Sequence, residues 1–102
     1  MELTQIKLID FGFAAHIDES KNERLTTKQG TLYYSSPEVL KGNYSFKCDI
    51  WSAGVICFIL LSDDFPFWGS SDQEIMKSIQ EGSYSFSADG WIDISDLAKD
   101  FV

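Results

Sequence analysis

The sequence predicts a mainly α-helical fold with one short strand near its N-terminus. Residues 46–61 form a long, mostly apolar run, and residues 71–80 carry apolar side chains at helical spacing. A further helix begins near residue 95, and only residues 3–9 alternate as a strand does. The chain has 102 residues, of which 44% are hydrophobic, so it can build one modest core.

The predicted strand is followed by a turn and a long loop. Within residues 3–9, Ile6 and Leu8 share one face. Residues 10–12 then form a turn that ends in glycine. Residues 13–35 are a polar stretch of 23 residues with weak periodicity, which predicts a loop. A loop of this length inside a compact domain usually either has a function or is disordered.

A short helix is predicted to begin at Pro37. Ser36 is a good N-cap, proline suits the first helical position, and Glu38 lies near the positive end of the helix dipole. Gly42 is a typical stop residue.

The helix from about Phe46 to Leu61 is apolar nearly all round, as is typical of a helix buried in a larger core. We expect Asp63 and Asp64 to end it. The large side chains expected to be buried are Ile50, Trp51, Val55, Phe58 and Ile59.

The next helix is predicted over residues 71–80, with Gly82 as its stop. Its inward side chains are Ile75, Met76 and Ile79. A further helix is predicted to begin at Ile94–Ser95.

Charge is unevenly distributed and excludes some partners. The formal net charge is -8, and residues 63–102 hold nine acids but only Lys77 and Lys99 as bases. Such a surface disfavours nucleic acid and anionic membranes and is compatible with basic peptides. Solubility is the alternative explanation for most of these carboxylates.

The two cysteines indicate a reducing compartment. Cys48 and Cys57 lie nine residues apart in one predicted helix, which separates them by about 13 Å of rise and prevents a disulfide. Neither has a metal-ligand partner at suitable spacing. The apolar run at residues 55–61 is too short to span a bilayer. We therefore expect an intracellular, cytoplasmic protein.

Four motifs occur in a distinctive order along the chain. They are Asp10-Phe11-Gly12, Gly30-Thr31 with Tyr34, Ser36-Pro37-Glu38, and Asp49-Ile50-Trp51-Ser52 with Gly54. In this order the chain resembles the C-terminal lobe of a eukaryotic serine/threonine protein kinase of the calcium/calmodulin-dependent group. It is most similar to the calcium-dependent protein kinases of plants and protists.

The resemblance implies one partial protein kinase domain over residues 1–102. The magnesium motif and activation segment would occupy residues 10–38. The helical portion of the lobe would occupy residues 39–102, giving about three to four helices after the short strand.

The resemblance also implies roles for individual residues. Asp10 would bind the Mg²⁺ that bridges the ATP phosphates, and Ile9 would line the nucleotide pocket. An ordinary turn aspartate is the alternative for Asp10. Thr27 would be a phosphorylation site of the activation loop, with a solvated loop hydroxyl as the alternative.

The substrate loop implied by the resemblance contains Gly30, Thr31 and Tyr34, and the Gly30–Thr31 pair favours serine or threonine as acceptor. Further residues would be structural: Phe11, Gly12, Pro37, Glu38, Asp49, Trp51 and Gly54. Glu38 would be a buried acid whose arginine partner is expected beyond Val102. Asp49 would hold the backbone of the catalytic loop rather than lie exposed.

Several kinase motifs do not occur in this sequence. It has no Gly-rich phosphate loop, no lysine–glutamate pair and no His-Arg-Asp loop that carries the catalytic base. We therefore expect a piece of a kinase that is inactive by itself, with its base upstream.

Two rival interpretations remain open. One is a binding module that uses the aromatic turn (Phe65, Phe67 and Trp68) and an acidic helix. The other is a kinase-like scaffold without catalysis. The expected partners are a protein or peptide substrate and, in a longer protein, a calcium-binding EF-hand region. We also expect the isolated chain to be marginally stable, to self-associate or to depend on a partner.

Overall fold

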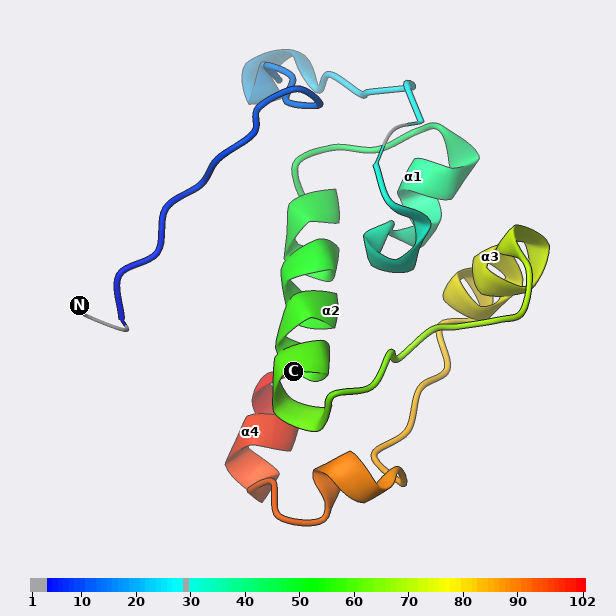
Figure 1. The fold of residues 1–102 in the computed structure, drawn as a ribbon. Helices are drawn as coiled ribbons and strands as arrows, with labels where there is room; N and C mark the ends of the chain where they lie inside the picture. The colour runs from blue at the N-terminus through cyan, green and yellow to red at the C-terminus, as the bar shows by residue number, and fades with distance from the viewer. Residues whose placement is uncertain (1–3, 29) are drawn as a thin grey trace.

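The computed structural model describes residues 4–28 and 30–102 (Figure 1). In chain order the elements are η1 (Glu19–Lys21), η2 (Leu32–Tyr34), α1 (Pro37–Lys41), α2 (Cys48–Ser62), α3 (Asp72–Glu81), η3 (Asp89–Trp91) and α4 (Asp96–Phe101). The mainly α-helical class is thus confirmed. None of the helices in the described ranges is long and apolar enough to cross a membrane.

The predicted N-terminal strand is wrong for the residues that the structure describes. Residues 5–10 have no strand partner, and the only β-type pairing in the described ranges is an isolated antiparallel bridge between Leu25 and Tyr44. Ile6 and Leu8 are 90% and 83% exposed. An alternating sequence becomes a strand only where a neighbour completes its hydrogen bonds. Leu3, in the predicted strand, lies outside the described residues.

Helix α1 begins and ends as predicted. The Ser36 hydroxyl accepts a hydrogen bond from the Val39 backbone N–H at 3.3 Å, and Pro37 occupies the first turn. Gly42 ends the helix in a left-handed conformation with φ of 73°. These local signals therefore place the helix that follows the long loop.

Helix α3 begins and ends one residue later than predicted. Ser71 caps its N-terminus and Gly82 ends it in a left-handed conformation. Ile75 and Ile79 are buried as expected, whereas Met76 is only half-buried.

Helix α2 begins at Cys48, two residues later than predicted, and Asp63 ends it in a left-handed conformation with φ of 56°. Val55 and Phe58 are buried. Three further predicted core residues are less enclosed: Trp51 and Ile59 are half-buried, and Ile50 is 72% exposed. The prediction for Ile50 is wrong because η2 and η3 are the main elements that contact α2, which leaves its remaining faces without cover.

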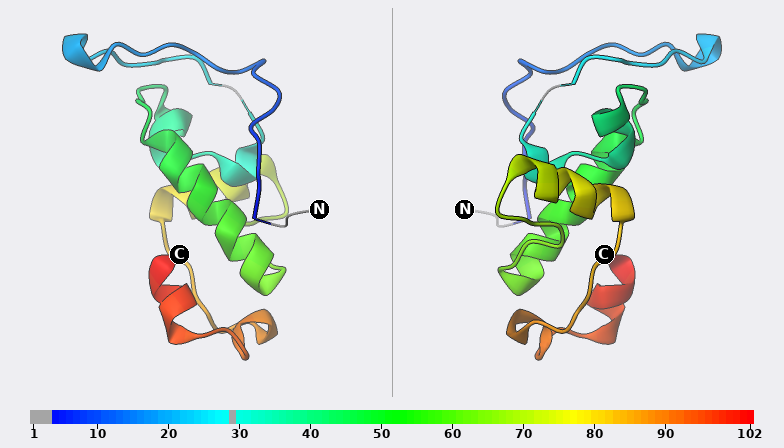
Figure 2. Two further views of the ribbon diagram at one scale, coloured as in Figure 1. Left: turned by 90° about the vertical axis from the view of Figure 1, so that its left-hand side faces the viewer. Right: turned by 90° about the vertical axis from the view of Figure 1, so that its right-hand side faces the viewer.

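The core lies between α2 and α3. One cluster contains Val55, Phe67, Ile75 and Ile79. A second, aromatic cluster lies where η3 meets the end of α2, and there Trp91 contacts Phe58 edge-on with ring centroids 4.7 Å apart. In Figures 1 and 2, α1 and α3 lie on one side of α2, while η3 and α4 lie near its C-terminal end.

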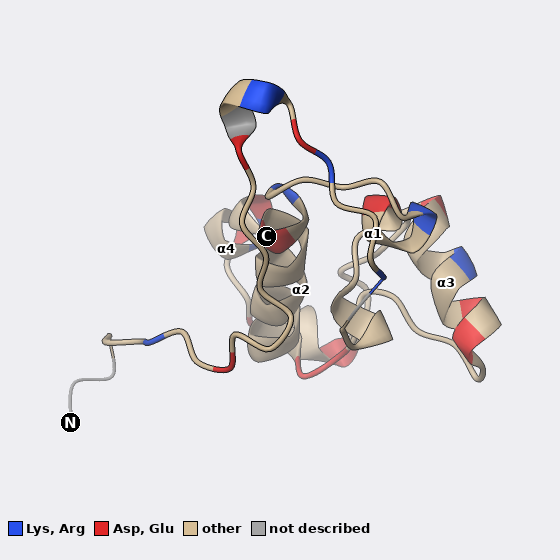
Figure 3. Cartoon of the chain, turned by 90° about the horizontal axis from the view of Figure 1, so that it is seen from above, with Lys and Arg blue, Asp and Glu red and all other residues tan. Residues whose placement is uncertain are grey.

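The N-terminal residues lie outside this helical body. The extended segment runs away from α2, and η1 projects beyond the helices (Figures 1 and 2). Acidic residues recur on α3, α4 and the turn after α2 (Figure 3). Cys48 and Cys57 are free thiols in α2, and both are half-buried.

Candidate functional site

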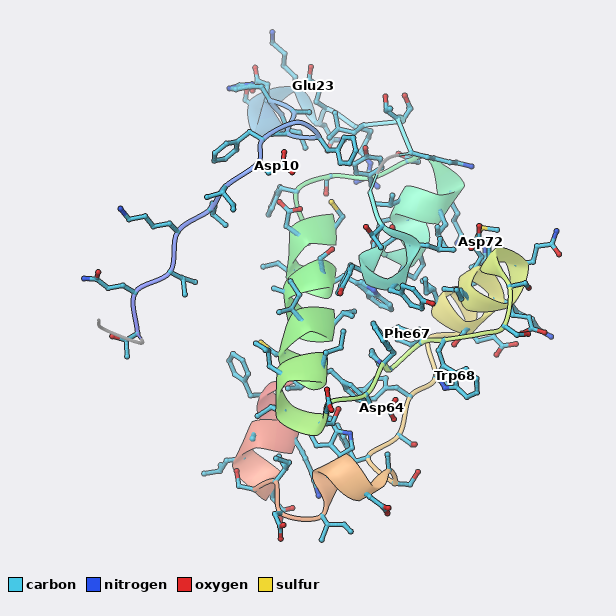
Figure 4. All side chains as sticks on the ribbon, in the orientation of Figure 1. Asp10, Glu23, Asp64, Phe67, Trp68 and Asp72 are labelled. Atoms are coloured by element: carbon cyan, nitrogen blue, oxygen red, sulfur yellow. The ribbon has the colours of Figure 1, made fainter. Side chains whose placement is uncertain are left out.

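The turn at Asp10 is formed, but it is exposed. Asp10 has a left-handed backbone with φ of 60°, which aspartate tolerates better than most residues. Its Oδ1 accepts a hydrogen bond from the Gly12 backbone N–H at 3.4 Å, and the Ala14 N–H donates to the Phe11 carbonyl at 3.0 Å. Figure 4 shows Asp10 on the N-terminal segment, outside the helical body.

The described residues do not enclose a nucleotide around this turn. Ile9 is 83% exposed, and Phe11 is 67% exposed. Within residues 4–28 and 30–102, no group of three His, Cys, Asp or Glu residues could hold a metal ion. Asp10 therefore offers one free carboxylate, which fits Mg²⁺ as a single hard ligand, because this ion commonly takes one or two carboxylates together with phosphates and water.

The predicted substrate loop is brought against the beginning of α2. Gly30, Thr31 and Tyr34 line one cavity of about 200 Å³ together with Asp49 and, among others, Tyr44, Cys48 and Ser52. We call this the loop cavity. Residues that were predicted from separate motifs thus share one site.

Two hydroxyl groups hold the substrate loop in place. The Ser52 hydroxyl of α2 donates to the Tyr34 carbonyl at 2.8 Å. Ser35 donates to the Thr31 carbonyl at 3.3 Å, which closes the turn around η2. The loop is therefore tied both to the helix and to itself.

Asp49 lies exposed at the N-terminus of α2, contrary to the expectation that it would be shielded. That expectation relied on the burial of Ile50 and Trp51, of which Trp51 is half-buried but Ile50 is 72% exposed. The Cys48 thiol lies 3.8 Å from Asp49 Oδ1. Burial, and then the negative charge of Asp49, raise the pKa of the Cys48 thiol, so the uncharged thiol is favoured.

Glu38 is half-buried rather than fully buried. Within the described ranges the ion pairs are Lys21–Asp18 and Lys77–Glu81, and both lie at the surface. Neither of these pairs includes Glu38, and its arginine partner beyond Val102 stays a prediction.

An apolar groove of about 660 Å³ runs along α2. Trp51 and Gly54, both predicted structural residues, line it together with Glu38. Trp51 stacks on Phe67 with centroids 5.3 Å apart and planes at 15°. The Trp51 indole nitrogen is buried and has no hydrogen-bond partner among the described residues.

The aromatic turn is only partly available to a partner. Phe67 is 4% exposed and points toward the core, whereas Trp68 is 67% exposed (Figure 4). Phe65 is 38% exposed and contacts Tyr33 at a centroid distance of 4.7 Å. A binding module that needs all three rings at its surface is therefore not supported.

Thr27 is exposed, and its backbone is held by the turn that follows α1. The Tyr44 hydroxyl donates a hydrogen bond to the Thr27 carbonyl. Leu25 and Tyr44 exchange backbone hydrogen bonds of 2.7 and 3.0 Å. Arg24 Nε donates to Asn43 Oδ1 at 2.9 Å, and Nη2 donates to the Asn43 carbonyl at 3.3 Å. We call these contacts the loop clamp.

Apart from Thr27, the clamp residues received no role from sequence reasoning. Tyr44 lies beside a recognised motif, but no local pattern connects it with a carbonyl that lies 17 residues earlier. Ser52 was quoted in a motif without its hydrogen bond to the substrate loop. Only a structure brings such contacts together.

Comparison with known proteins identifies close relatives. The profile of the protein kinase domain matches residues 1–102. Over 97 residues the chain is 48% identical to calcium-dependent protein kinase 3 of Plasmodium yoelii yoelii and to calcium-dependent protein kinase 4 of Plasmodium falciparum, a match that covers 95% of this chain and 18% of each relative. Calcium-dependent protein kinase 5 of Plasmodium falciparum is 43% identical over 101 residues, covering 99% of this chain and 17% of that protein. The chain thus spans less than a fifth of the length of these relatives.

Proposed function

The chain belongs to the protein kinase family, and from this premise we propose that it forms part of a serine/threonine kinase of the calcium-dependent type. The whole protein would transfer the γ-phosphoryl group of ATP to a hydroxyl group of a protein or peptide. The observation that best supports this is the loop cavity, where Gly30 and Thr31 meet Asp49 of α2. A phosphoryl acceptor needs such a positioned loop, because transfer depends mainly on alignment and charge stabilisation.

Protein kinases as a family use ATP and Mg²⁺. In this proposal Asp10 provides the one protein carboxylate of this chain that holds the ion. The turn keeps one carboxylate oxygen toward the Gly12 N–H, which leaves the other oxygen free for the ion. When bound, Mg²⁺ neutralises charge on the phosphate oxygens.

The 102-residue chain should have no transferase activity by itself. The sequence contains no His-Arg-Asp loop and no Gly-rich phosphate loop. In the proposal these parts come from other regions of a longer protein. An EF-hand region there would provide calcium regulation, and a basic peptide would suit the acidic residues at 63–102.

The test uses the full-length protein with Mg²⁺-ATP and a basic peptide that contains one serine. We expect transfer to this peptide, and much less to the same peptide with tyrosine in place of serine. Transfer should also rise when calcium is added after chelation. The 102-residue chain should give no transfer above the buffer.

The matched variants are Asp10→Asn and Asp63→Asn. Both aspartates are exposed and have positive φ, 60° and 56°, so asparagine fits both backbones. Asp10→Asn should lower kcat by about a thousandfold or more, because it removes an anion that holds the metal during transfer. Asp63→Asn should leave kcat within about twofold of the unmutated protein, because it touches only the end of α2.

Two results would contradict the proposal. Near-normal turnover in Asp10→Asn would make this residue an ordinary turn aspartate. A folded full-length protein that transfers no phosphate under any of these conditions would favour the scaffold interpretation.

A further inference from the structure

The loop clamp joins two segments that are far apart in sequence. Residues 24–27 lie in the second half of the long loop, and residues 42–44 form the turn after α1. Gly42 brings them close, because a Cβ atom there would lie 3.3 Å from the Thr26 carbonyl oxygen. The turn after α1 therefore packs directly against the loop backbone.

Tyr44 lies at the centre of this contact and has two roles. Its backbone completes the bridge to Leu25. Its side chain lines the loop cavity, and its hydroxyl donates to the Thr27 carbonyl. Tyr44 thus contacts the loop at two positions before Gly30: at Leu25 through its backbone and at Thr27 through its hydroxyl.

Few other contacts fix this part of the loop. The residues from 26 to 28 are exposed, as is Gly30, and no regular secondary structure holds them. Gly30 has φ of 100°, a conformation that glycine adopts without strain but that also gives the backbone freedom. The position of Thr31 at the cavity therefore depends on anchors on either side, which are the loop clamp before it and the η2 hydrogen bonds after it.

We propose that Tyr44 is a positioning residue whose hydroxyl fixes residues 24–27, so that Thr27 stays displayed to solvent and Thr31 stays at the loop cavity. The inference adds a residue and a hydrogen bond to the site. Its kinetic consequence rests on the proposed kinase function, whereas its structural content does not.

Three variants separate the hydroxyl from the ring. Tyr44→Phe removes only the hydroxyl, and Tyr44→Ala also removes the ring from the cavity wall. Tyr84→Phe is the control, because Tyr84 is 53% exposed and its recorded contacts with Phe58 and Phe67 are made by the ring, which phenylalanine keeps.

The first measurement is amide hydrogen exchange of the full-length protein by NMR. Tyr44→Phe should speed exchange of the Leu25 N–H by about threefold to tenfold, which is the effect of losing one net hydrogen bond on local opening. The Ile79 N–H of α3 should exchange at an unchanged rate, and Tyr84→Phe should change neither. Unchanged Leu25 exchange in Tyr44→Phe, or equal acceleration at Leu25 and Ile79, would overturn the inference.

The second measurement uses the full-length protein and the serine peptide. Tyr44→Phe should raise KM for the peptide by about threefold to tenfold with kcat nearly unchanged, and Tyr44→Ala should raise KM further. A residue that only supports the fold would lower thermal stability without shifting KM, and this result would overturn the positioning role.

The two proposals fail in different ways. If the unmutated full-length protein transfers no phosphate, the proposed function fails, while accelerated exchange at Leu25 still supports the clamp. If transfer occurs but neither exchange nor KM responds to Tyr44→Phe, the clamp is wrong and the function stands.

Discussion

The residues before α1 and the residues from α1 onward differ in how far their apolar side chains are buried. In the first region Ile6, Leu8 and Ile9 are 83–90% exposed, and Phe11 and Phe13 are 67–72% exposed. Every buried apolar residue of the described chain lies in the second region, between Val55 and Trp91. The helical region therefore contains the buried core, against which Leu32, Tyr33 and Tyr34 of η2 also pack, whereas residues 4–13 contribute no buried side chain.

The loop cavity is where the two regions meet. Thr31 comes from the loop and Asp49 from α2, so the site needs residues from both regions. Functional residues on loops that a rigid scaffold positions are common, because a loop can adjust without a cost to the core. The difference between the two regions can be tested by making the same substitution in both.

The largest expected difference comes from Ile79→Ala and Ile6→Ala. Ile79 is fully buried in α3, so its loss should cost about 2–5 kcal/mol of unfolding free energy. Ile6 is 90% exposed, and its replacement should change stability by less than about 0.5 kcal/mol. Urea unfolding of both variants measures the difference. Equal losses would show that the N-terminal segment shares the core.

The second prediction concerns self-association through α2. Ile56 and Leu60 lie four residues apart on one face of the helix and are 47% and 79% exposed. Each large side chain left in water forgoes roughly 1.5–3 kcal/mol, so we expect the isolated chain to be marginally stable and to associate through this face.

Sedimentation of two double variants tests this prediction. Ile56→Gln with Leu60→Gln should shift the chain toward monomer. Leu8→Gln with Ile9→Gln should have a smaller effect, because an extended segment presents no continuous rigid surface. A strictly monomeric unmutated chain with a sharp, concentration-independent melting transition would contradict the expected self-association.

The helix ends could be predicted because their signals are local. Ser36, Gly42 and Gly82 act on backbone groups within a few residues, and each does in the structure what its position predicts. The exposure of Ile50 could not be predicted in this way, because it depends on which elements cover α2. The strand at residues 3–9 failed for the same reason, because it needs a partner strand.

The site was predictable only in part. The motifs named Gly30, Thr31 and Asp49, and the structure brings them to one cavity. The roles of these residues and of Asp10 remain predictions. No sequence pattern indicated the hydrogen bond from Tyr44 to Thr27, because contacts across 17 residues follow from the path of the chain and not from local preference.

A smaller effect is expected from removing one serine hydroxyl in each region. The Ser71 hydroxyl accepts from the Glu74 backbone N–H at 3.2 Å and caps α3, so Ser71→Ala should cost about 1 kcal/mol. The Ser20 hydroxyl donates to Asp18 at 2.6 Å in the exposed loop, and Ser20→Ala should leave the unfolding free energy nearly unchanged. Thermal unfolding of the two variants compares them. A similar loss from both would mean that the loop contributes to global stability.

The smallest expected effect is on the pKa values of two carboxylates, Asp18 in the first region and Glu74 in the second. Hydrogen bonding by the Ser20 hydroxyl lowers the pKa of Asp18 from its ordinary 3.8, and hydrogen bonding by the Ser70 hydroxyl lowers the pKa of Glu74 from its ordinary 4.5. Because both values are lower in the folded chain, each carboxylate adds stability above its ordinary pKa. That contribution is lost as pH falls through the lowered folded value.

NMR titration of the two carboxylates can show whether the regions fold independently. Ser20→Ala should return the pKa of Asp18 toward 3.8, and Ser70→Ala should return the pKa of Glu74 toward 4.5. In Ile79→Ala the helical region is weakened, so the lowered pKa of Glu74 should be lost. The lowered pKa of Asp18 should persist, because its contact closes within two residues of the loop. If both values return together, the loop and the helices form one cooperative unit and do not fold independently.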